Sequence, residues 1–273
     1  MELKRYRVAI IGCGWVGVGY SSDGITWKRD THIRAYQSNP RTEVITMCDK
    51  DAQKVVRVFS KYSNLPAGVW PADALWVEYL PMVKRMNLDI VSVCTSPETH
   101  SQIVCDIAPY VKAIYCEKPI ADTIEDAQKM IDICHKHKVI LQVNHERRFI
   151  HPKFTFSRGI MDNGTHAFDL LRQLFGQYLG GYQRYSQKTF TMLFGRQWVE
   201  IEYKDTAERF FNLDCVRSSE PMIGKGVEHL VQCLDEGKQS ISSGEEALKT
   251  LGVVLSFKEK WETEHGEETY KRG

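Results

Sequence analysis

The residues best suited to chemistry form two short motifs. The first is a glycine loop at residues 12–17, Gly-Cys-Gly-Trp-Val-Gly, which follows the mainly apolar run 7–11. The second is Glu117-Lys118-Pro119, which follows the apolar run 113–116. A glycine loop after a strand can hold the pyrophosphate of a dinucleotide, and parallel sheets bind ligands at the carboxyl ends of their strands. Together the two motifs indicate redox chemistry on a small molecule.

Each glycine of the loop has its own expected role. Gly12 allows a tight turn, Gly14 lets the pyrophosphate approach the backbone, and Gly17 lets the next helix pack on the strand. Trp15 and Val16 open that helix, whose amino terminus supplies N–H groups and partial positive charge to phosphates. The alternative is a tight strand–helix turn that binds no ligand.

Asp49 follows the second strand-like run, 43–48. A carboxylate there accepts hydrogen bonds from ribose hydroxyls and repels the extra phosphate of NADP, so it predicts NAD, with NADP as the alternative. A solvated turn residue is the other interpretation of Asp49.

The stretch between the glycine loop and Asp49 exceeds the roughly 20 residues of the simple fingerprint. The excess, 19–27, is a polar and aromatic insertion that could overhang the cofactor.

Alternating strand-like and helical patterns must position these motifs. Short runs typical of strands buried on both faces of a parallel sheet occur at 6–11, 43–48, 89–94, 112–116 and 139–143. Helical patterns lie between them at 31–38, 52–62, 72–86, 98–110 and 123–137, the last opened by a weakened capping box at Thr123 and Asp126. The alternation predicts an α/β Rossmann domain, a doubly wound parallel sheet, over residues 1–145.

The second half of the chain has a different pattern. A helix is expected from about 163 to 175, then strands at 182–189, 191–194, 198–203 and 208–216, and helices at 221–235 and 245–263. This order predicts an α+β domain with an antiparallel sheet over 146–273.

Composition excludes several classes of protein. The 273 residues are 42% hydrophobic, and a formal net charge of +1 argues against a general nucleic-acid binder. No apolar run approaches the ~20 residues that span a membrane, and the start of the chain, Lys4-Arg5-Tyr6, leads straight into a strand rather than a signal peptide. The eight cysteines contain no Cys-x-x-Cys pair. They are interpreted as reduced core residues of a cytoplasmic protein.

Further motifs make the chain resemble the glucose–fructose oxidoreductase/inositol dehydrogenase (Gfo/Idh/MocA) family of NAD(P)-dependent enzymes. Besides the glycine loop, the matches are Cys94-Thr95-Ser96-Pro97 with His100, Glu117-Lys118-Pro119, and the segment 159–169 with Asp162 and His166. The terminal segments 237–239 and 243–247 also fit. These elements in this order are far more specific than the glycine loop alone.

The resemblance implies a Rossmann domain followed by a domain with an open antiparallel sheet. It implies a sugar, cyclitol or related polyol as substrate, and a homodimer or homotetramer that assembles through the open sheet. The resemblance assigns catalysis to Lys118, Asp162 and His166. The expected cofactor-binding residues are Gly12, Gly14, Trp15, Val16, Gly17, Asp49, Thr95, Pro97, His100, Glu117 and Lys118; no metal is expected.

Residue chemistry suits these roles. Asp162 and His166 are four residues apart and would share one helix face, where the carboxylate would orient an imidazole that exchanges the substrate proton. Lys118 would stabilise negative charge on the reacting oxygen. For Asp162 and His166 the alternative is a capping Asp with an exposed His, and for Lys118 it is a surface lysine paired with Glu117.

Other residues have different expected roles. His135 and His137 are expected to be solvated cations at a helix end. For His145, Arg147 and Arg148, ligand contacts and interdomain ion pairs are both open.

The leading hypothesis is an NAD-dependent oxidoreductase of a sugar-like, cyclitol or related polyol. One alternative is the same fold acting on an imine, a sugar nucleotide or a dihydrodiol. Another is a catalytically silent dinucleotide-binding or regulatory protein. The segment 148–159 is shorter than in the family, which places a helix and a strand there. This predicts either a trimmed substrate domain or a sequence that omits stretches of the full protein.

Overall fold

The computed structural model divides the chain into two compact units. It describes residues 4–21, 24–25, 30–62, 75–149, 169, 178–184, 189–194, 197–205, 209–211 and 221–265. The first unit comprises Met1–Ile150 and Ser218–Glu245, and the second comprises residues 151–217 and 246–273. A domain boundary after residue 145 stays a prediction. The contact pattern adds that residues 218–245 group with the first unit.

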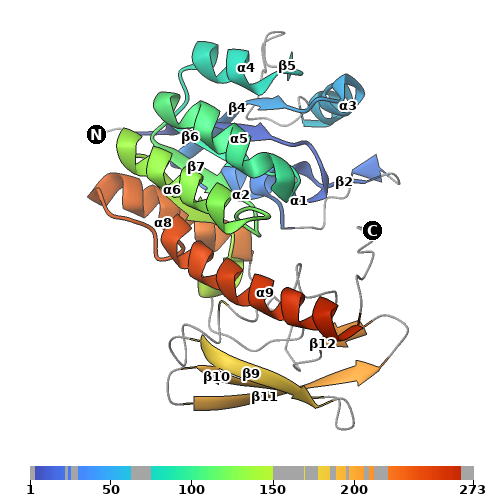
Figure 1. The fold of residues 1–273 in the computed structure, drawn as a ribbon. Coiled ribbons are helices and arrows are strands. Elements are labelled where there is room, and N and C mark those ends of the chain that lie inside the picture. The colour runs from blue at the N-terminus through green and yellow to red at the C-terminus, as the bar shows by residue number, and fades with distance from the viewer. Residues whose placement is uncertain are drawn as a thin grey trace. The chain divides into compact units, whose positions relative to one another are not determined.

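A parallel sheet forms the centre of the first unit (Figure 1). Its six strands have the order β5–β4–β1–β6–β7–β8, and neighbouring strands are parallel. Their bounds are β1 Tyr6–Ile11, β4 Thr42–Cys48, β5 Leu75–Trp76, β6 Ile90–Val93, β7 Ala113–Cys116 and β8 Ile140–Val143. The five strands expected from the sequence are confirmed within one residue at each end. They were recognisable because every residue of β6, β7 and β8 is buried, which demands apolar runs.

Several helices pack around this sheet or against one another. Helix α2 (His32–Ser38) contacts β4 and α8 (Met222–Glu236), whereas α5 (Pro97–Ile107) contacts α4 (Tyr79–Met86) and α6 (Ile124–His137). Helix α3 (Ala52–Tyr62) contacts β5. Thr31 caps α2, and Thr123 Oγ1 caps α6 by accepting from Asp126 N at 3.1 Å.

The predicted start of the helix over 72–86 is wrong. Leu75 and Trp76 form the edge strand β5, which pairs with Met47 and Cys48 of β4. Helix α4 begins only at Tyr79. Pairing with a distant strand therefore overrides the local helical pattern. The helix expected over 98–110 ends at Ile107 and continues as a 3₁₀ turn, Ala108–Tyr110.

Four antiparallel strands lie in the second unit, in the order β12–β11–β10–β9. They are β9 Tyr178–Arg184, β10 Thr189–Phe194, β11 Gln197–Asp205 and β12 Arg209–Phe211. The single strand expected over 182–189 is wrong, because β9 begins earlier and Thr189 already belongs to β10. The expected helix over 163–175 lies outside the described residues except for Asp169. The long helix α9 spans Gly244–His265.

Helix α8 is joined to the first unit by polar contacts at both ends. At its amino end, Ile223 N donates to Asp30 Oδ2 at 2.7 Å. At its carboxyl end, Asp235 Oδ1 accepts from the Tyr6 hydroxyl at 2.7 Å and from Arg41 Nη2 at 2.8 Å. Burial and this contact with Asp235 raise the pKa of Tyr6 to about 12. The helix is therefore an integral part of the first unit, although it lies far from the sheet in sequence.

The described helices include none that is long and apolar enough to cross a membrane. The cysteines among the described residues are free thiols, and Cys215 lies outside those residues.

We expect the Tyr6→Phe variant to loosen α8 specifically. A hydrogen bond to a charged partner contributes roughly 1.5–3 kcal/mol, with the lower end expected here because Asp235 is partly exposed. Hydrogen exchange should show faster exchange of the α8 amides in this variant. The matched control is Tyr79→Phe, which removes a 2.6 Å bond to Asp106 outside α8. Equal effects of both variants on α8 would contradict this view of its attachment.

Candidate functional site

The expected site residues of the glycine loop and of the Glu117-Lys118-Pro119 motif lie at the carboxyl ends of the parallel strands. The chain fills one half of the sheet with β1, β4 and β5 and the other with β6, β7 and β8, so the strand order reverses between β1 and β6. A crevice for ligands forms outside such a reversal. The glycine loop follows β1, and the Glu117-Lys118-Pro119 motif follows β7, two strands away. One edge of one sheet therefore carries both motifs.

Gly12 and Gly17 are required by the packing of the loop. Gly12 has a φ of +97°, and a Cβ there would lie 2.6 Å from the carbonyl oxygen of Cys94. A Cβ at Gly17 would lie 2.3 Å from the carbonyl oxygen of Gly12. Both residues let backbone segments approach more closely than any side chain permits.

Gly14 differs from the other two glycines. A Cβ built on it meets no atom of the described residues, beyond its chain neighbours, within 4 Å, and its φ of −87° and ψ of −162° are open to other residues. The fold therefore does not need glycine at this position. The empty space above its backbone is what a closely approaching pyrophosphate requires.

The helix after the loop is a single turn. Helix α1 spans only Trp15–Val18 and ends at Gly19 in the left-handed conformation. A single turn sums few peptide dipoles, so it adds little of the charge that a long helix offers a phosphate. Within the loop, the N–H groups of Gly12 and Cys13 already donate to Cys48 O and Asp49 Oδ2. The insertion that follows contains two paired strands, β2 (Tyr20–Ser21) and β3 (Gly24–Ile25). Its expected position over a cofactor stays a prediction.

Asp49 is tied directly to the glycine loop. Its Oδ2 accepts from Cys13 N at 2.8 Å, and its Oδ1 accepts from Asp51 N at 2.9 Å. A carboxylate has about four acceptor positions, so both oxygens keep capacity for ribose hydroxyls. Asp49 is half-buried and part of the loop architecture, not a freely solvated turn residue.

The loop after β6 approaches the glycine loop from the neighbouring strand. Pro97 is the first residue of α5, and Thr95 Oγ1 accepts from Thr99 Oγ1 at 2.8 Å. His100 is fully buried. Its Nε2 lies 3.0 Å from the Thr95 carbonyl, and its Nδ1 lies 3.1 Å from the Pro119 carbonyl. Any role of His100 toward a cofactor is therefore indirect, because the ring joins the β6 loop to the β7 loop.

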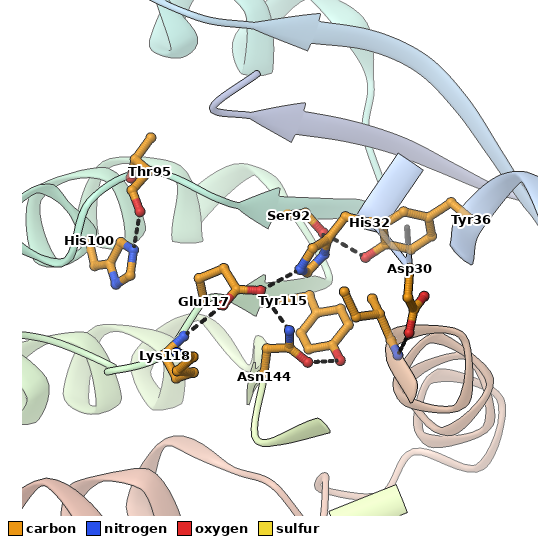
Figure 2. A network of polar contacts seen from close by, with 11 residues as sticks. Asp30, His32, Tyr36, Ser92, Thr95, His100, Tyr115, Glu117, Lys118 and Asn144 are labelled. Carbon is orange, nitrogen blue, oxygen red and sulfur yellow. Dashed lines mark hydrogen bonds and ion pairs between the residues drawn. The ribbon is translucent and has the colours of Figure 1, made fainter. Parts of the chain in front are cut away.

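Glu117 is buried, and its carboxylate contacts the side chains of His32 and Asn144 and the backbone of Lys118 (Figure 2). Its Oε1 lies 2.8 Å from His32 Nε2 and accepts from Asn144 Nδ2 at 2.6 Å. Its Oε2 accepts from the backbone N–H of Lys118 at 3.2 Å. Lys118 itself is half-buried and precedes a cis peptide bond to Pro119.

The network extends beyond Glu117 in both directions (Figure 2). His32 Nδ1 lies 3.0 Å from Ser92 Oγ, which lies 2.9 Å from the Tyr36 hydroxyl. On the other side, the Tyr115 hydroxyl donates to Asn144 Oδ1 at 2.6 Å. Side chains from α2, β6, β7 and the end of β8 thus converge on one buried carboxylate.

The charge of Glu117 is stabilised despite its burial. Burial raises the pKa of this carboxyl, but the hydrogen bond and charge of His32, the charge of Lys118 and the Asn144 amide outweigh it. The pKa of Glu117 in the folded protein therefore lies below its ordinary value. The stability that this ionised group contributes is present above the ordinary carboxyl pKa and is lost as pH falls through the lowered one.

Sequence reasoning missed His32, Ser92, Tyr36, Tyr115 and Asn144. No local pattern marks them, since His32 and Glu117 are 85 positions apart.

Of the other predicted residues, Asp162 and His166 lie outside the described residues. Among the described residues, no group of three or more His, Cys, Asp or Glu side chains could hold a metal ion. The space above Gly14 and the acceptor Asp49 fit a dinucleotide.

Residues 6–145 match the model of a family described as an oxidoreductase family with an NAD-binding Rossmann fold. The chain is 24% identical to the rhizopine catabolism protein MocA of Rhizobium meliloti over 220 residues, which is 68% of the chain and 62% of that protein. It is 36% identical to the myo-inositol 2-dehydrogenase of Thermotoga maritima over 84 residues, 31% of the chain and 25% of that protein. The matched part covers less than two thirds of the length of each relative.

Solved structures show the same fold. An oxidoreductase from Agrobacterium radiobacter in complex with NAD+, L-tartaric acid and magnesium matches with a TM-score of 0.68 at 16% identity, covering 92% of this chain and 95% of that one. The aldose–aldose oxidoreductase from Caulobacter crescentus, complexed with glycerol, matches with a TM-score of 0.63 at 16% identity, covering 93% and 96%.

We expect the Gly14→Ala variant to separate cofactor binding from folding. The added methyl group would occupy the space that the pyrophosphate needs, so calorimetry should show NADH affinity reduced by roughly tenfold or more, about 1.4 kcal/mol. The free energy of unfolding should change by less than about 1 kcal/mol, because the backbone angles suit alanine.

Gly17→Ala is the matched control for this experiment. Its methyl group would clash with the Gly12 carbonyl, and overpacking of this kind costs about 1–3 kcal/mol of stability. If Gly14→Ala binds NADH as wild type does, the pyrophosphate does not lie over Gly14.

Proposed function

The chain belongs to the Gfo/Idh/MocA oxidoreductase family, and from this premise we propose that it transfers a hydride between a nicotinamide cofactor and a sugar-like or cyclitol alcohol. The observation that carries this proposal is the glycine loop, Asp49 and Lys118 at one edge of one parallel sheet. Relatives named as dehydrogenases of D-apiose, myo-inositol and D-xylose support the class of substrate.

The residues of this chain divide the binding of a dinucleotide among them. The pyrophosphate would lie over the open backbone of Gly14, with Gly12 and Gly17 shaping the loop, and Asp49 would accept hydrogen bonds from the adenosine ribose, which favours NAD over NADP. The bound nicotinamide supplies the hydride acceptor or donor. Thr95, Pro97 and the buried His100 would shape the side of the crevice formed by the loop after β6.

Lys118 would act on the substrate rather than on the cofactor. Its ammonium would donate to the reacting oxygen and stabilise the negative charge that develops there as the hydroxyl proton leaves. In the proposal, His166 accepts the hydroxyl proton and Asp162 orients its imidazole. Both assignments rest on the family resemblance.

We also propose that the second unit provides an open antiparallel sheet for self-association. Within β11, apolar and charged residues alternate in Val199-Glu200-Ile201-Glu202, as in a sheet with two different faces. One face would pack on helices and the other on a second copy of the chain, giving a homodimer or homotetramer. The cytoplasmic location expected from the cysteines also stays a prediction.

The proposed function predicts turnover of alcohols that depends on Lys118. A panel of sugars, cyclitols and other polyols with NAD+ should produce NADH, measured by its absorbance, with at least one compound. Lys118→Ala should lower kcat by about 10²–10³-fold, the typical effect of losing one charge-stabilising donor, with NADH affinity preserved. The control is Lys129→Ala, an exposed lysine on α6 paired with Asp126, which should behave as wild type.

Two results would contradict the proposal. Binding of NADH without turnover of any compound would favour the catalytically silent alternative. Full turnover by Lys118→Ala would remove Lys118 from the chemistry.

A further inference from the structure

His32 is held more firmly than a space-filling core residue requires. Its ring is fully buried, and both nitrogens have polar neighbours, Glu117 and Ser92. Its face also meets the edge of Tyr115, with ring centroids 4.8 Å apart and an interplanar angle of 60°. The ring therefore has one orientation, with Nε2 aimed at the Glu117 carboxylate (Figure 2).

The hydrogen-bond directions around His32 form one consistent chain. With Nε2 protonated, the ring donates to Glu117, and its Nδ1 accepts from the Ser92 hydroxyl. The Ser92 oxygen then accepts from the Tyr36 hydroxyl. Every polar atom of the chain is satisfied in this arrangement, as buried polar groups require.

Stability alone does not explain why a carboxylate and its imidazole partner are buried at this place. Buried charged groups can often be replaced by packed apolar residues with no loss of stability, because desolvation offsets the attraction of their partners. Here the carboxylate directly precedes Lys118 and accepts its backbone N–H at 3.2 Å. The pair therefore lies where it affects the orientation of the loop that carries the proposed catalytic lysine.

We propose that His32 is a positioning residue for the reaction: its Nε2–H holds the Glu117 carboxylate in place, and this carboxylate in turn fixes the backbone of Lys118. The inference rests on the proposed function, because it concerns the reaction assigned to that lysine. His32 touches neither substrate nor cofactor in this role; it acts through Glu117.

The surroundings of Glu117 give this role a pH signature. The titratable groups that face it are His32 from α2, Lys118 on its own loop, the half-buried Cys94, and the buried Cys116 and Tyr115. Burial and the charge of Glu117 raise the pKa of each of the last three, so they stay neutral. Among these groups, only His32 and Lys118 lower the pKa of Glu117. Removing His32 leaves less to offset the effect of burial on the pKa of Glu117. This pKa should therefore rise, so that the carboxyl takes up a proton at higher pH.

The test compares His32→Leu with His32→Gln. Leucine removes the donor, whereas the glutamine amide can still donate to Glu117. We expect His32→Leu to lower kcat by about 10²-fold, the effect of a misplaced catalytic group, with little change in the KM for NAD+. The acid limb of its rate–pH profile should move to higher pH. His32→Gln should recover most of both changes, which a simple loss of packing would not allow.

A second measurement does not depend on turnover. Carbon-13 NMR of the labelled Glu117 carboxyl should show protonation at higher pH in His32→Leu than in His32→Gln or wild type. If the leucine variant does not fold, His32→Asn replaces it, because the shorter amide cannot reach Glu117. The control is Tyr36→Phe, which removes a buried hydrogen bond at the far end of the network and should leave the Glu117 titration unchanged.

The outcomes separate this inference from the proposed function. Identical Glu117 titration and identical acid limbs in wild type and the donor-free variant would overturn the role of His32. Absence of turnover in wild type, with a Glu117 titration that still responds to His32, would instead overturn the proposed function.

Discussion

The buried carboxylate of Glu117 is the interaction on which the site depends. Through His32, Asn144 and the backbone of Lys118, it joins α2 to the carboxyl ends of β7 and β8. Leaving a buried charged group without its partner typically costs about 3–5 kcal/mol, a large part of the roughly 5–15 kcal/mol that keeps a domain folded. The partners of this carboxylate therefore contribute to the stability of this edge of the sheet. Its position beside Lys118 couples that requirement to the chemistry.

The glycine loop, which follows β1 two strands away from β7, meets a complementary constraint. At Gly12 and Gly17 a side chain would clash with nearby backbone atoms, whereas a Cβ on Gly14 would meet no atom of the described residues, beyond its chain neighbours, within 4 Å. Asp49 fixes this loop through Cys13 N, as Glu117 fixes the loop of Lys118. Each half of the sheet thus uses one carboxylate to hold the backbone around the ligand crevice.

The sequence predicted the parallel sheet well because its strands are buried on both faces and leave apolar runs, as at 90–93 and 113–116. The short edge strand β5 has no such run and depends on pairing with β4, so it was missed. Helix α8 was predicted, but its attachment through Tyr6 and Asp235 joins residues 229 positions apart. The His32–Glu117 contact is equally non-local. Motifs reveal which residues meet a ligand, whereas the residues that hold those motifs are visible only in the folded chain.

Calorimetric titration of the wild-type protein with NADH, with NADPH as comparison, tests the central claim most directly. The claim is that the carboxyl edge of the parallel sheet is a nicotinamide dinucleotide site with Asp49 at the ribose. It predicts saturable binding of one NADH per chain and weaker binding of NADPH, since the Asp49 carboxylate repels the additional phosphate. Failure to bind either dinucleotide would contradict the site, and tighter binding of NADPH would contradict the role of Asp49.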